Sequence, residues 1–298
     1  MDIKFSIIMP NFNSPFLYKA IKSVIDQNYN GWELIIIDNF SQNNPEHILD
    51  KFKDDRVKFF KFDNNNVIAK SRNFGIKKSN YDWIAFLDSD DKWEKNKLLF
   101  ISQKIKEFSP DFLYHGMYYL PNKLGFIKRV IKDKSKEIKK PIFENLIIKG
   151  NGIANSSAVV KKNLLTEINY LSEDISKFSW EDYDCWIRCS QKTDNFLYIP
   201  EILGSCWVGG GNISSIEQSF INYKNFHQIY KNEIFNLTGK KKLNWYNEFL
   251  LTWFFKKKRL QRAMLILKKI RLRNLRLILL SIIIRTKFFF KKCKKLKI

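Results

Sequence analysis

The stretch Tyr81–Lys92 reads YDWIAFLDSDDK, and the rest of the chain is organised around it. A short apolar run, Trp83–Leu87, ends abruptly in the acidic cluster Asp88–Asp91. Because the run is short and contains aromatic residues, it predicts a buried strand. Three carboxylates at one strand end repel each other, and a divalent cation that prefers oxygen ligands would stabilise them. The alternative interpretation is that a residue of this cluster caps a helix that begins near Trp93.

Apolar runs and helical patterns alternate along residues 5–108, on both sides of this cluster. They predict strands at residues 5–9, 32–38 and 57–62, helices at 16–27, 45–54 and 68–78, and a further helix from Trp93 to about Phe108. This alternation is typical of α/β proteins with a mostly parallel sheet that helices cover on both faces. Right-handed crossovers bring the strand ends to one side, so we expect four polar segments to converge there: Pro10–Asn13, Asp38–Asn39, Arg72 and Asp88–Asp91.

The edge where these segments meet has the geometry of a nucleotide-binding crevice. It lacks a glycine-rich phosphate loop, since neither G-x-G-x-x-G nor the P-loop pattern occurs in the sequence. The charge of a diphosphate would then have to be balanced by a metal ion and by basic side chains. This requirement favours a functional role for the acidic cluster.

The net charge of +23 is concentrated at the C-terminus. Residues 240–298 hold 20 of the 53 Lys and Arg residues but one of the 30 acidic residues, and the rest of the chain is close to balance. In this tail, apolar clusters alternate with basic patches, which predicts amphipathic helices that lie in a membrane interface and bind anionic lipids. One alternative is that the helices pack on the preceding domain. Nucleic-acid binding is the other, and no accompanying motif supports it.

The four cysteines form no C-x-x-C pair, which is typical of a reducing compartment. The first apolar run, Phe5–Met9, is too short for a signal peptide. The sequence contains no uninterrupted stretch of about 18 apolar residues, so it predicts no ordinary transmembrane helix. We therefore expect a cytoplasmic protein that lies peripherally on the inner face of the plasma membrane.

Five segments in register resemble family 2 glycosyltransferases of the GT-A fold, of the type that builds bacterial surface polysaccharides. They are SIIMPNFN (Ser6–Asn13), AIKSVIDQNY (Ala20–Tyr29), ELIIIDNFS (Glu33–Ser41), AKSRNFGI (Ala69–Ile76) and WIAFLDSDD (Trp83–Asp91). A sixth segment, SWEDYDCWIRC (Ser179–Cys189), resembles the Glu-Asp helix start on the family's acceptor side. The similarity covers roughly residues 3–215. It implies a GT-A domain at 1–239, with a donor half at about 1–110 and an acceptor half at about 111–215, before the tail at 240–298.

The resemblance implies a site for a nucleotide-sugar donor, with a UDP-sugar favoured. Phe12 would stack on uracil or thymine, and Asn39 and Arg72 would contact the base and the phosphate region. Asp88 would touch the ribose, and Asp90 would ligate a Mn²⁺ or Mg²⁺ ion that bridges the diphosphate. The implied donor-binding set is completed by Pro10, Asp38 and Ser89.

On the acceptor side, the resemblance makes Asp182 the general base that removes the proton of the acceptor hydroxyl. A single displacement of this kind would invert the anomeric centre. Glu181 precedes Asp182 at a predicted helix start, where acidic residues also suit the helix dipole without any catalytic role. We further expect Asn155 or Ser156 to face the acceptor.

The chain departs from the family pattern at three places. Asn39 stands where a second Asp is common, and its amide could pair with uracil or, flipped, with cytosine. Val67 replaces a usual Gly before the Arg-Asn pair. No His occurs at residues 207–214, so the metal would have to be held by Asp90, diphosphate oxygens and water.

Together these inferences predict a metal-dependent, inverting hexosyl- or N-acetylhexosaminyltransferase that extends a lipid-linked or cell-surface glycan. The departures keep open an alternative from another class, a catalytically silent scaffold or binding protein at the membrane. A nucleic-acid-binding protein is a third alternative, and it would require an affinity for oligonucleotides that falls steeply with salt.

Overall fold

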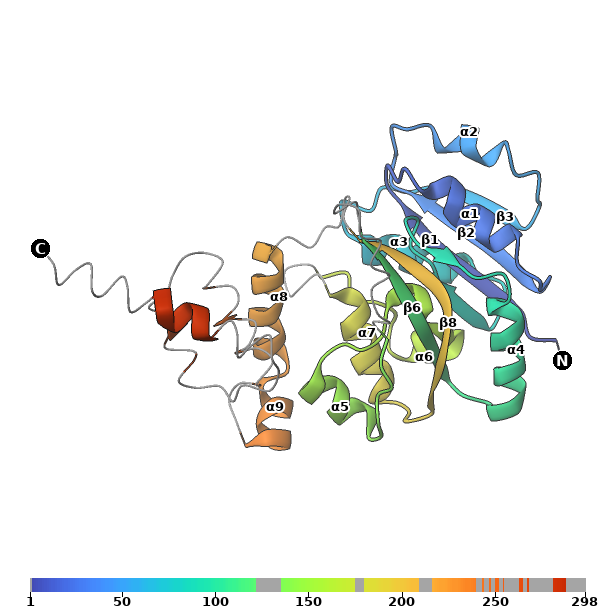
Figure 1. Cartoon of the computed structure of the whole chain (residues 1–298). Coiled ribbons are helices and arrows are strands. Elements are labelled where there is room, and N and C mark those ends of the chain that lie inside the picture. Colours follow the sequence, from blue (N-terminus) through green and yellow to red (C-terminus); the bar gives the residue numbers. More distant parts are fainter. Residues whose placement is uncertain are drawn as a thin grey trace, which may run out of the picture. The chain divides into compact units, whose positions relative to one another are not determined.

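The computed structural model of the chain describes residues 2–121, 135–174, 180–208 and 216–239. Beyond these it describes residues 243, 247, 250, 251, 254, 263, 264, 267 and 281–287 (Figure 1). Most of the predicted amphipathic tail lies outside the described residues, as do residues 209–215, where the sequence lacks a histidine. Among the helices that are described, none combines the length and the apolar character needed to cross a membrane.

The chain forms two compact units. The first contains a sheet of eight described strands and the helices that cover it. The second contains helices α8 (Ile216–Ile229) and α9 (Lys231–Thr238), and a small apolar cluster of Leu251, Ala263, Leu267 and Ile284. The predicted division between residues 239 and 240 stays a prediction, because so little of the tail is described.

All eight strands lie in one mixed sheet with the order β3-β2-β1-β4-β7-β6-β8-β5 (Figure 1). They are β1 (Phe5–Asn11), β2 (Trp32–Asp38), β3 (Val57–Lys61), β4 (Trp83–Phe86), β5 (Lys92–Trp93), β6 (Phe112–Pro121), β7 (Val159–Lys161) and β8 (Phe196–Val208). The first four strands in this order pair in parallel, as predicted from the alternation. Strand β7 runs antiparallel between β4 and β6, while β5 pairs antiparallel with β8.

Helices cover both faces of the sheet, which explains why every residue of β1 and β2 is buried. Helices α1 (Leu17–Ile25) and α4 (Lys97–Phe108) share one apolar core with the β1 side chains of Phe5 and Ile7. Helix α3 (Ile68–Lys78) packs on the other face, where the backbone at Gly75 approaches Ile8 and Ile37 closely. The other helical segments of the first unit are α2 (Pro45–Leu49), the 3₁₀ turn η1 (Asn155–Ser157), α6 (Lys162–Glu167) and α7 (Glu181–Ser190). Helix α5 (Ile142–Lys149) belongs to the first unit up to Leu146.

Two boundaries differ from the prediction in ways that affect the site. The helix predicted from Trp93 begins at Lys97 with Asn96 in its N-cap position, so the capping interpretation of the acidic cluster is wrong. Residues 92–93 instead form β5, because Lys92 and Trp93 pair with β8. Strand β1 continues through Pro10 to Asn11; β4 pairs only with Phe5–Ile8, so the missing N–H of Pro10 removes no ladder bond on that side.

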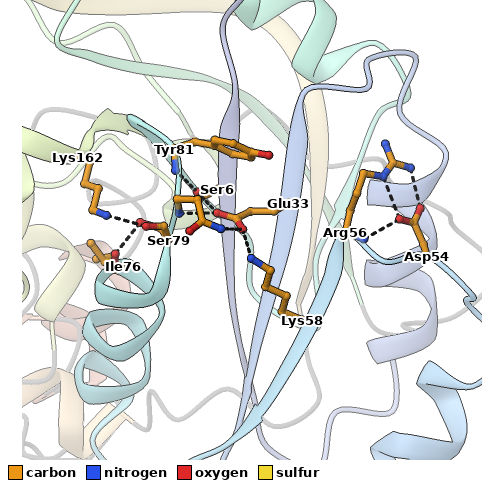
Figure 2. A network of polar contacts seen from close by, with 10 residues as sticks. Ser6, Glu33, Asp54, Arg56, Lys58, Ile76, Ser79, Tyr81 and Lys162 are labelled. Carbon is orange, nitrogen blue, oxygen red and sulfur yellow. Dashed lines mark hydrogen bonds and ion pairs between the residues drawn. The ribbon is translucent and has the colours of Figure 1, made fainter.

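A polar network joins the amino ends of the central strands, at the edge opposite the acidic cluster (Figure 2). Glu33 of β2 accepts hydrogen bonds from the Ser6 hydroxyl of β1 at 2.6 Å and from Lys58 Nζ of β3 at 2.7 Å. The backbone N–H and side-chain amide of Asn80, just before β4, also donate to Glu33 at 2.6 and 2.7 Å. One buried carboxylate therefore connects β1, β2 and β3 with the segment just before β4.

Candidate active site

The acidic cluster forms a tight turn at the carboxyl end of β4, and we call residues Asp88–Asp91 the aspartate turn. The backbone N–H of Asp91 donates to the carbonyl of Asp88 at 3.0 Å and closes the turn. The Ser14 hydroxyl, from the loop after β1, donates to the carbonyl of Ser89 at 2.8 Å. The turn is thereby fixed to the end of the neighbouring strand, as the convergence of strand ends predicts.

The three aspartates of this turn have different surroundings. Asp88 Oδ1 accepts from Arg72 Nη2 at 2.7 Å and from Asn155 Nδ2 at 2.9 Å. Asp91 is buried, where burial and then the charges of Asp88 and Asp90 raise its pKa to about 7. Within the described part of the chain, the Asp90 carboxylate has no hydrogen bond or ion pair with another side chain. Burial and the charge of Asp88 raise the pKa of Asp90 to about 6.

The surroundings of Asp90 fit a hard divalent cation. A desolvated carboxylate next to a second carboxylate, without a basic partner of its own, is stabilised by a cation that takes oxygen ligands. Among the described residues, no three His, Cys, Asp or Glu side chains are grouped closely enough to hold a metal by themselves. Asp90 would therefore bind such an ion together with oxygens of a bound diphosphate.

Arg72 connects the aspartate turn to the start of α7. It lies on α3 and is 3% exposed, and its Nη1 and Nη2 bond to Glu181 and Asp88 respectively. These two carboxylates raise its pKa even though burial lowers it. Arg72 was predicted to contact the base and phosphate region, and the structure places it between the two halves of the site. Its Nε has no partner among the described residues.

Glu181 and Asp182 open α7, as the sequence predicts for this segment. Asp182 Oδ1 accepts the N–H of Tyr183 at 2.7 Å, at the positive end of the helix. Burial, followed by the charge of Glu181, raises the pKa of Asp182 to about 6, while Arg72 opposes this shift. A carboxyl group with a pKa of about 6 is mostly deprotonated at neutral pH and remains basic enough to accept a proton.

The polar residues at the ends of β1 and β2 bond mainly to one another. Asp38 is fully buried, and its carboxylate accepts from Asn11 Nδ2 at 2.6 Å and from the Ser41 N–H and hydroxyl at 2.8 and 2.6 Å. Asn39 Oδ1 accepts the N–H of Asn64 at 3.1 Å, which connects this edge to the loop before α3. Asp38 thus holds the loop in place, and Asn39 keeps its NH₂ group as a donor.

Exposed aromatic rings flank this polar edge. Phe12, directly after β1, is 58% exposed, which fits a ring that stacks on a nucleotide base. Phe40, after β2, is equally exposed at 58%, and sequence reasoning missed it. Pro10 is buried in β1 opposite Ile37 and shapes the strand rather than presenting a polar group.

Asn155 and Ser156, predicted to face the acceptor, lie in η1 against the aspartate turn. Ser156 is 1% exposed and its hydroxyl accepts the Asp88 N–H at 3.0 Å. Asn155 is 8% exposed and leaves its Oδ1 without a partner among the described residues. Sequence reasoning also missed Lys97, which bonds to the Ser156 carbonyl. Its signal was its place in the apolar register of α4, one turn before Ile101.

Comparisons with known proteins agree with this geometry. The family model described as Glycosyl transferase family 2 matches residues 6–166, which is more than half of the chain. An Escherichia coli relative, UDP-Glc:alpha-D-GlcNAc-diphosphoundecaprenol beta-1,3-glucosyltransferase WfgD, is 32% identical over 188 residues, or 62% of this chain and 69% of the relative. An uncharacterised glycosyltransferase of Haemophilus influenzae is 42% identical over 216 residues, or 70% of this chain and 81% of the relative.

Solved structures show the same fold. The crystal structure of a Staphylococcus aureus TarS fragment in complex with UDP-GlcNAc superposes with a TM-score of 0.59 at 17% identity, over 88% of this chain and 82% of that chain. The complex of that fragment with UDP gives a TM-score of 0.58 at 18% identity, over 85% of this chain and 80% of that chain. The predicted α/β fold of the GT-A type is thereby confirmed for the first unit.

Proposed function

The chain belongs to glycosyl transferase family 2, and from this premise we propose that it is an inverting, metal-dependent glycosyltransferase that uses a UDP-sugar. Membership of the family makes it a glycosyltransferase that acts on nucleotide sugars. The observation that carries the finer proposal is the Arg72 bridge. One buried guanidinium joins Asp88 of the donor side to Glu181 of the acceptor side, and so places Asp182 next to the aspartate turn.

The donor would bind along the carboxyl edge of the sheet. Phe12 offers an exposed ring to the uracil, and the Asn39 amide offers a hydrogen-bond donor to it. Asp90, with diphosphate oxygens, would hold Mn²⁺ or Mg²⁺. When bound, such an ion supplies Lewis-acid stabilisation to the diphosphate that leaves. The family supports a divalent cation in general, and the unpartnered Asp90 carboxylate supports this position.

The acceptor hydroxyl would approach from the side of α7. The Asp182 carboxylate takes its proton while the hydroxyl oxygen attacks the anomeric carbon from the face opposite the leaving diphosphate. One displacement on that geometry inverts the anomeric centre. Arg72 bonds both to Asp88 of the donor half and to Glu181, the residue before Asp182. These two bonds keep Asp182 close to the donor half.

The acceptor that we propose is a lipid-linked glycan of a bacterial surface polysaccharide. Support comes from the name of WfgD, which acts on a sugar diphosphoundecaprenol, and from a putative colanic acid biosynthesis transferase of E. coli, 24% identical over 89% of this chain. A peripheral position on the cytoplasmic face of the membrane would suit such a substrate. The basic composition of residues 240–298 supports that position through attraction to anionic lipids.

A donor screen with the full chain tests the proposal. UDP-, dTDP-, GDP- and CMP-sugars would be incubated with and without MnCl₂, and release of the nucleoside diphosphate or monophosphate would be followed in the presence of undecaprenyl-diphosphate-linked sugars. We expect metal-dependent turnover of a UDP-sugar. Asp182→Asn should lose transfer but keep UDP binding, whereas Asp90→Asn should lose the metal dependence of that binding. Turnover of no nucleotide sugar by the folded chain, with activity in cells unchanged by Asp182→Asn, would favour the silent scaffold.

A further inference from the structure

A buried lysine lies directly behind the aspartate turn, and the mechanism above does not use it. Lys97, in the first turn of α4, is 0% exposed. Its Nζ donates to the backbone carbonyl of Ser156 at 3.0 Å and lies 3.5 Å from the centroid of the Trp93 ring. Lysine is almost never fully buried unless it is paired, so this position requires a reason beyond filling the core.

Ser156 connects this lysine to both ends of the aspartate turn. Its carbonyl accepts Lys97 and also the indole N–H of Trp93, the latter at 2.8 Å. Its hydroxyl accepts the N–H of Asp88 at 3.0 Å and hydrogen-bonds to the carboxylate of Asp91. Each oxygen of Ser156 therefore has two partners, and all of them belong to the turn or to its immediate support.

Asp91 is the acidic side chain that faces this support. Burial lowers the pKa of Lys97 well below its ordinary value, and the charge of Asp91 opposes this shift more than any other charge does. The Cys206 thiol of β8 donates to Asp91 Oδ2 at 3.3 Å. Asp88 accepts hydrogen bonds from Arg72 and Asn155, and Asp91 is hydrogen-bonded to Ser156 and Cys206. The structure therefore leaves Asp90 as the carboxylate of the turn without a side-chain partner in the described part of the chain.

We propose that Lys97 is a positioning residue for glycosyl transfer, which acts through Ser156 and Asp91 to hold Asp90 in the orientation that meets the cation and the donor diphosphate. The inference rests on the proposed function. Three neighbouring carboxylates repel each other, and the Lys97 amine, bonded to the Ser156 carbonyl, fixes the residue that binds Asp88 and Asp91 from the side of the turn away from the donor. Without it, Asp91 would move toward water and take the Asp88–Asp90 backbone with it.

Lys97→Met in the full chain removes the amine that bonds to the Ser156 carbonyl and keeps a side chain of similar length for the core. The probe is UDP, titrated calorimetrically with and without MnCl₂, together with Mn²⁺ binding followed by electron paramagnetic resonance. We expect the affinity for UDP in the presence of Mn²⁺ to fall about 10- to 100-fold, as for other residues that orient a metal ligand. UDP affinity without metal should change little, because the base site at Phe12 and Asn39 does not depend on Lys97.

Lys104→Met is the matched control, because Lys104 lies on the same helix but pairs with Glu107 at the surface. Ser156→Ala is the second variant, since it keeps Lys97 and removes only the hydroxyl that joins Asp88 and Asp91. It should show the same metal-specific loss, and the double variant should lose less than the two single losses combined.

The outcomes separate the inference from the function on which it rests. Wild-type affinity for Mn²⁺–UDP in folded Lys97→Met overturns the inference, and so does wild-type affinity in Ser156→Ala if Lys97→Met does not fold. An equal loss of UDP affinity with and without Mn²⁺ also overturns it, because that result indicates a general structural defect. If the wild-type chain itself binds UDP no better with Mn²⁺, the proposed metal-dependent function fails first.

Discussion

Replacing Arg72 by methionine should destabilise the first unit more than any surface substitution. The guanidinium is 3% exposed and bonds to Asp88 and Glu181, whose side chains are 30% and 14% exposed. Removing one partner of a buried ion pair costs about 3–5 kcal/mol, because a charge stays buried without compensation. Since water reaches both carboxylates in part, we expect the lower end, about 3 kcal/mol at pH 7.5.

This loss should shrink as the pH falls. Arg72 opposes the effects of burial and Glu181 that raise the pKa of Asp182 to about 6. Without Arg72, the pKa of Asp182 in the folded state rises further above its value in the unfolded chain. The folded state then binds more protons than the unfolded state, so its stability increases as the pH falls from 7.5 to 5. The difference from wild type is therefore largest at pH 7.5.

Urea unfolding of the full chain at both pH values, followed by far-ultraviolet circular dichroism, measures this free energy. Arg56→Met is the control: Arg56 also bonds through two nitrogens, but both bind the single carboxylate of Asp54, Nε at 2.9 Å and Nη2 at 2.7 Å, and its side chain is 36% exposed. Its loss should be about 1 kcal/mol and should not change between these pH values. Equal losses for the two variants, or a loss for Arg72→Met that grows as the pH falls, would refute the reasoning.

Three further predictions concern the pH dependence of transfer, the hydrogen bonds of Glu33 and the packing of α3 on the sheet. Transfer measured as kcat/KM should fall below about pH 6, where Asp182 becomes protonated, and a profile flat down to pH 5 would exclude Asp182 as the base. Burial raises the pKa of Glu33, but hydrogen bonds from Lys58, Ser6 and Asn80 outweigh it and lower that pKa below its ordinary value. Glu33→Gln should therefore cost about 1–3 kcal/mol in urea unfolding at pH 7, and the difference from wild type should disappear as the pH falls through the folded-state pKa of Glu33. Gly75→Ala should cost about 1–3 kcal/mol in the same assay, because the added Cβ would lie 2.7 Å from Ile37 Cδ1 and 2.8 Å from Ile8 Cγ2.

The sequence predicted the elements whose signal is local. The strand Trp32–Asp38 and the helix Ile68–Lys78 have the predicted bounds, because an unbroken apolar run and a helical repeat each mark their own ends. Strands β5 and β7 were not predicted as such. They contain two and three residues, and their partners come from distant segments, so no periodicity reveals them. The helix predicted at 45–54 ends at Leu49.

The candidate site could be predicted as a set of residues but not as a set of contacts. The convergence of strand ends brings Arg72 and the aspartate turn together as expected, whereas the roles of Asp90 and Asp182 stay proposals. The sequence does not reveal that Arg72 bonds to Glu181, which lies 109 residues further along the chain. Lys97 lies in the apolar register of its helix, but a lysine there ordinarily extends its amine to solvent, so its complete burial is evident only from the fold.

The pairing of strand β5 has a consequence for the point in translation at which the aspartate turn can be anchored at both ends. The strand follows β4 in the chain after five residues, yet its hydrogen-bonding partner is β8, where Lys92 pairs with Ser205. Both ends of the aspartate turn are therefore fixed only when a segment more than a hundred residues downstream has left the ribosome and joined the sheet. A nascent chain that ends before Phe196 can form the parallel strands of the donor half, but its aspartate turn lacks this second anchor. The metal-dependent donor binding that we propose should thus begin late in translation, after α7 of the acceptor side has been synthesised.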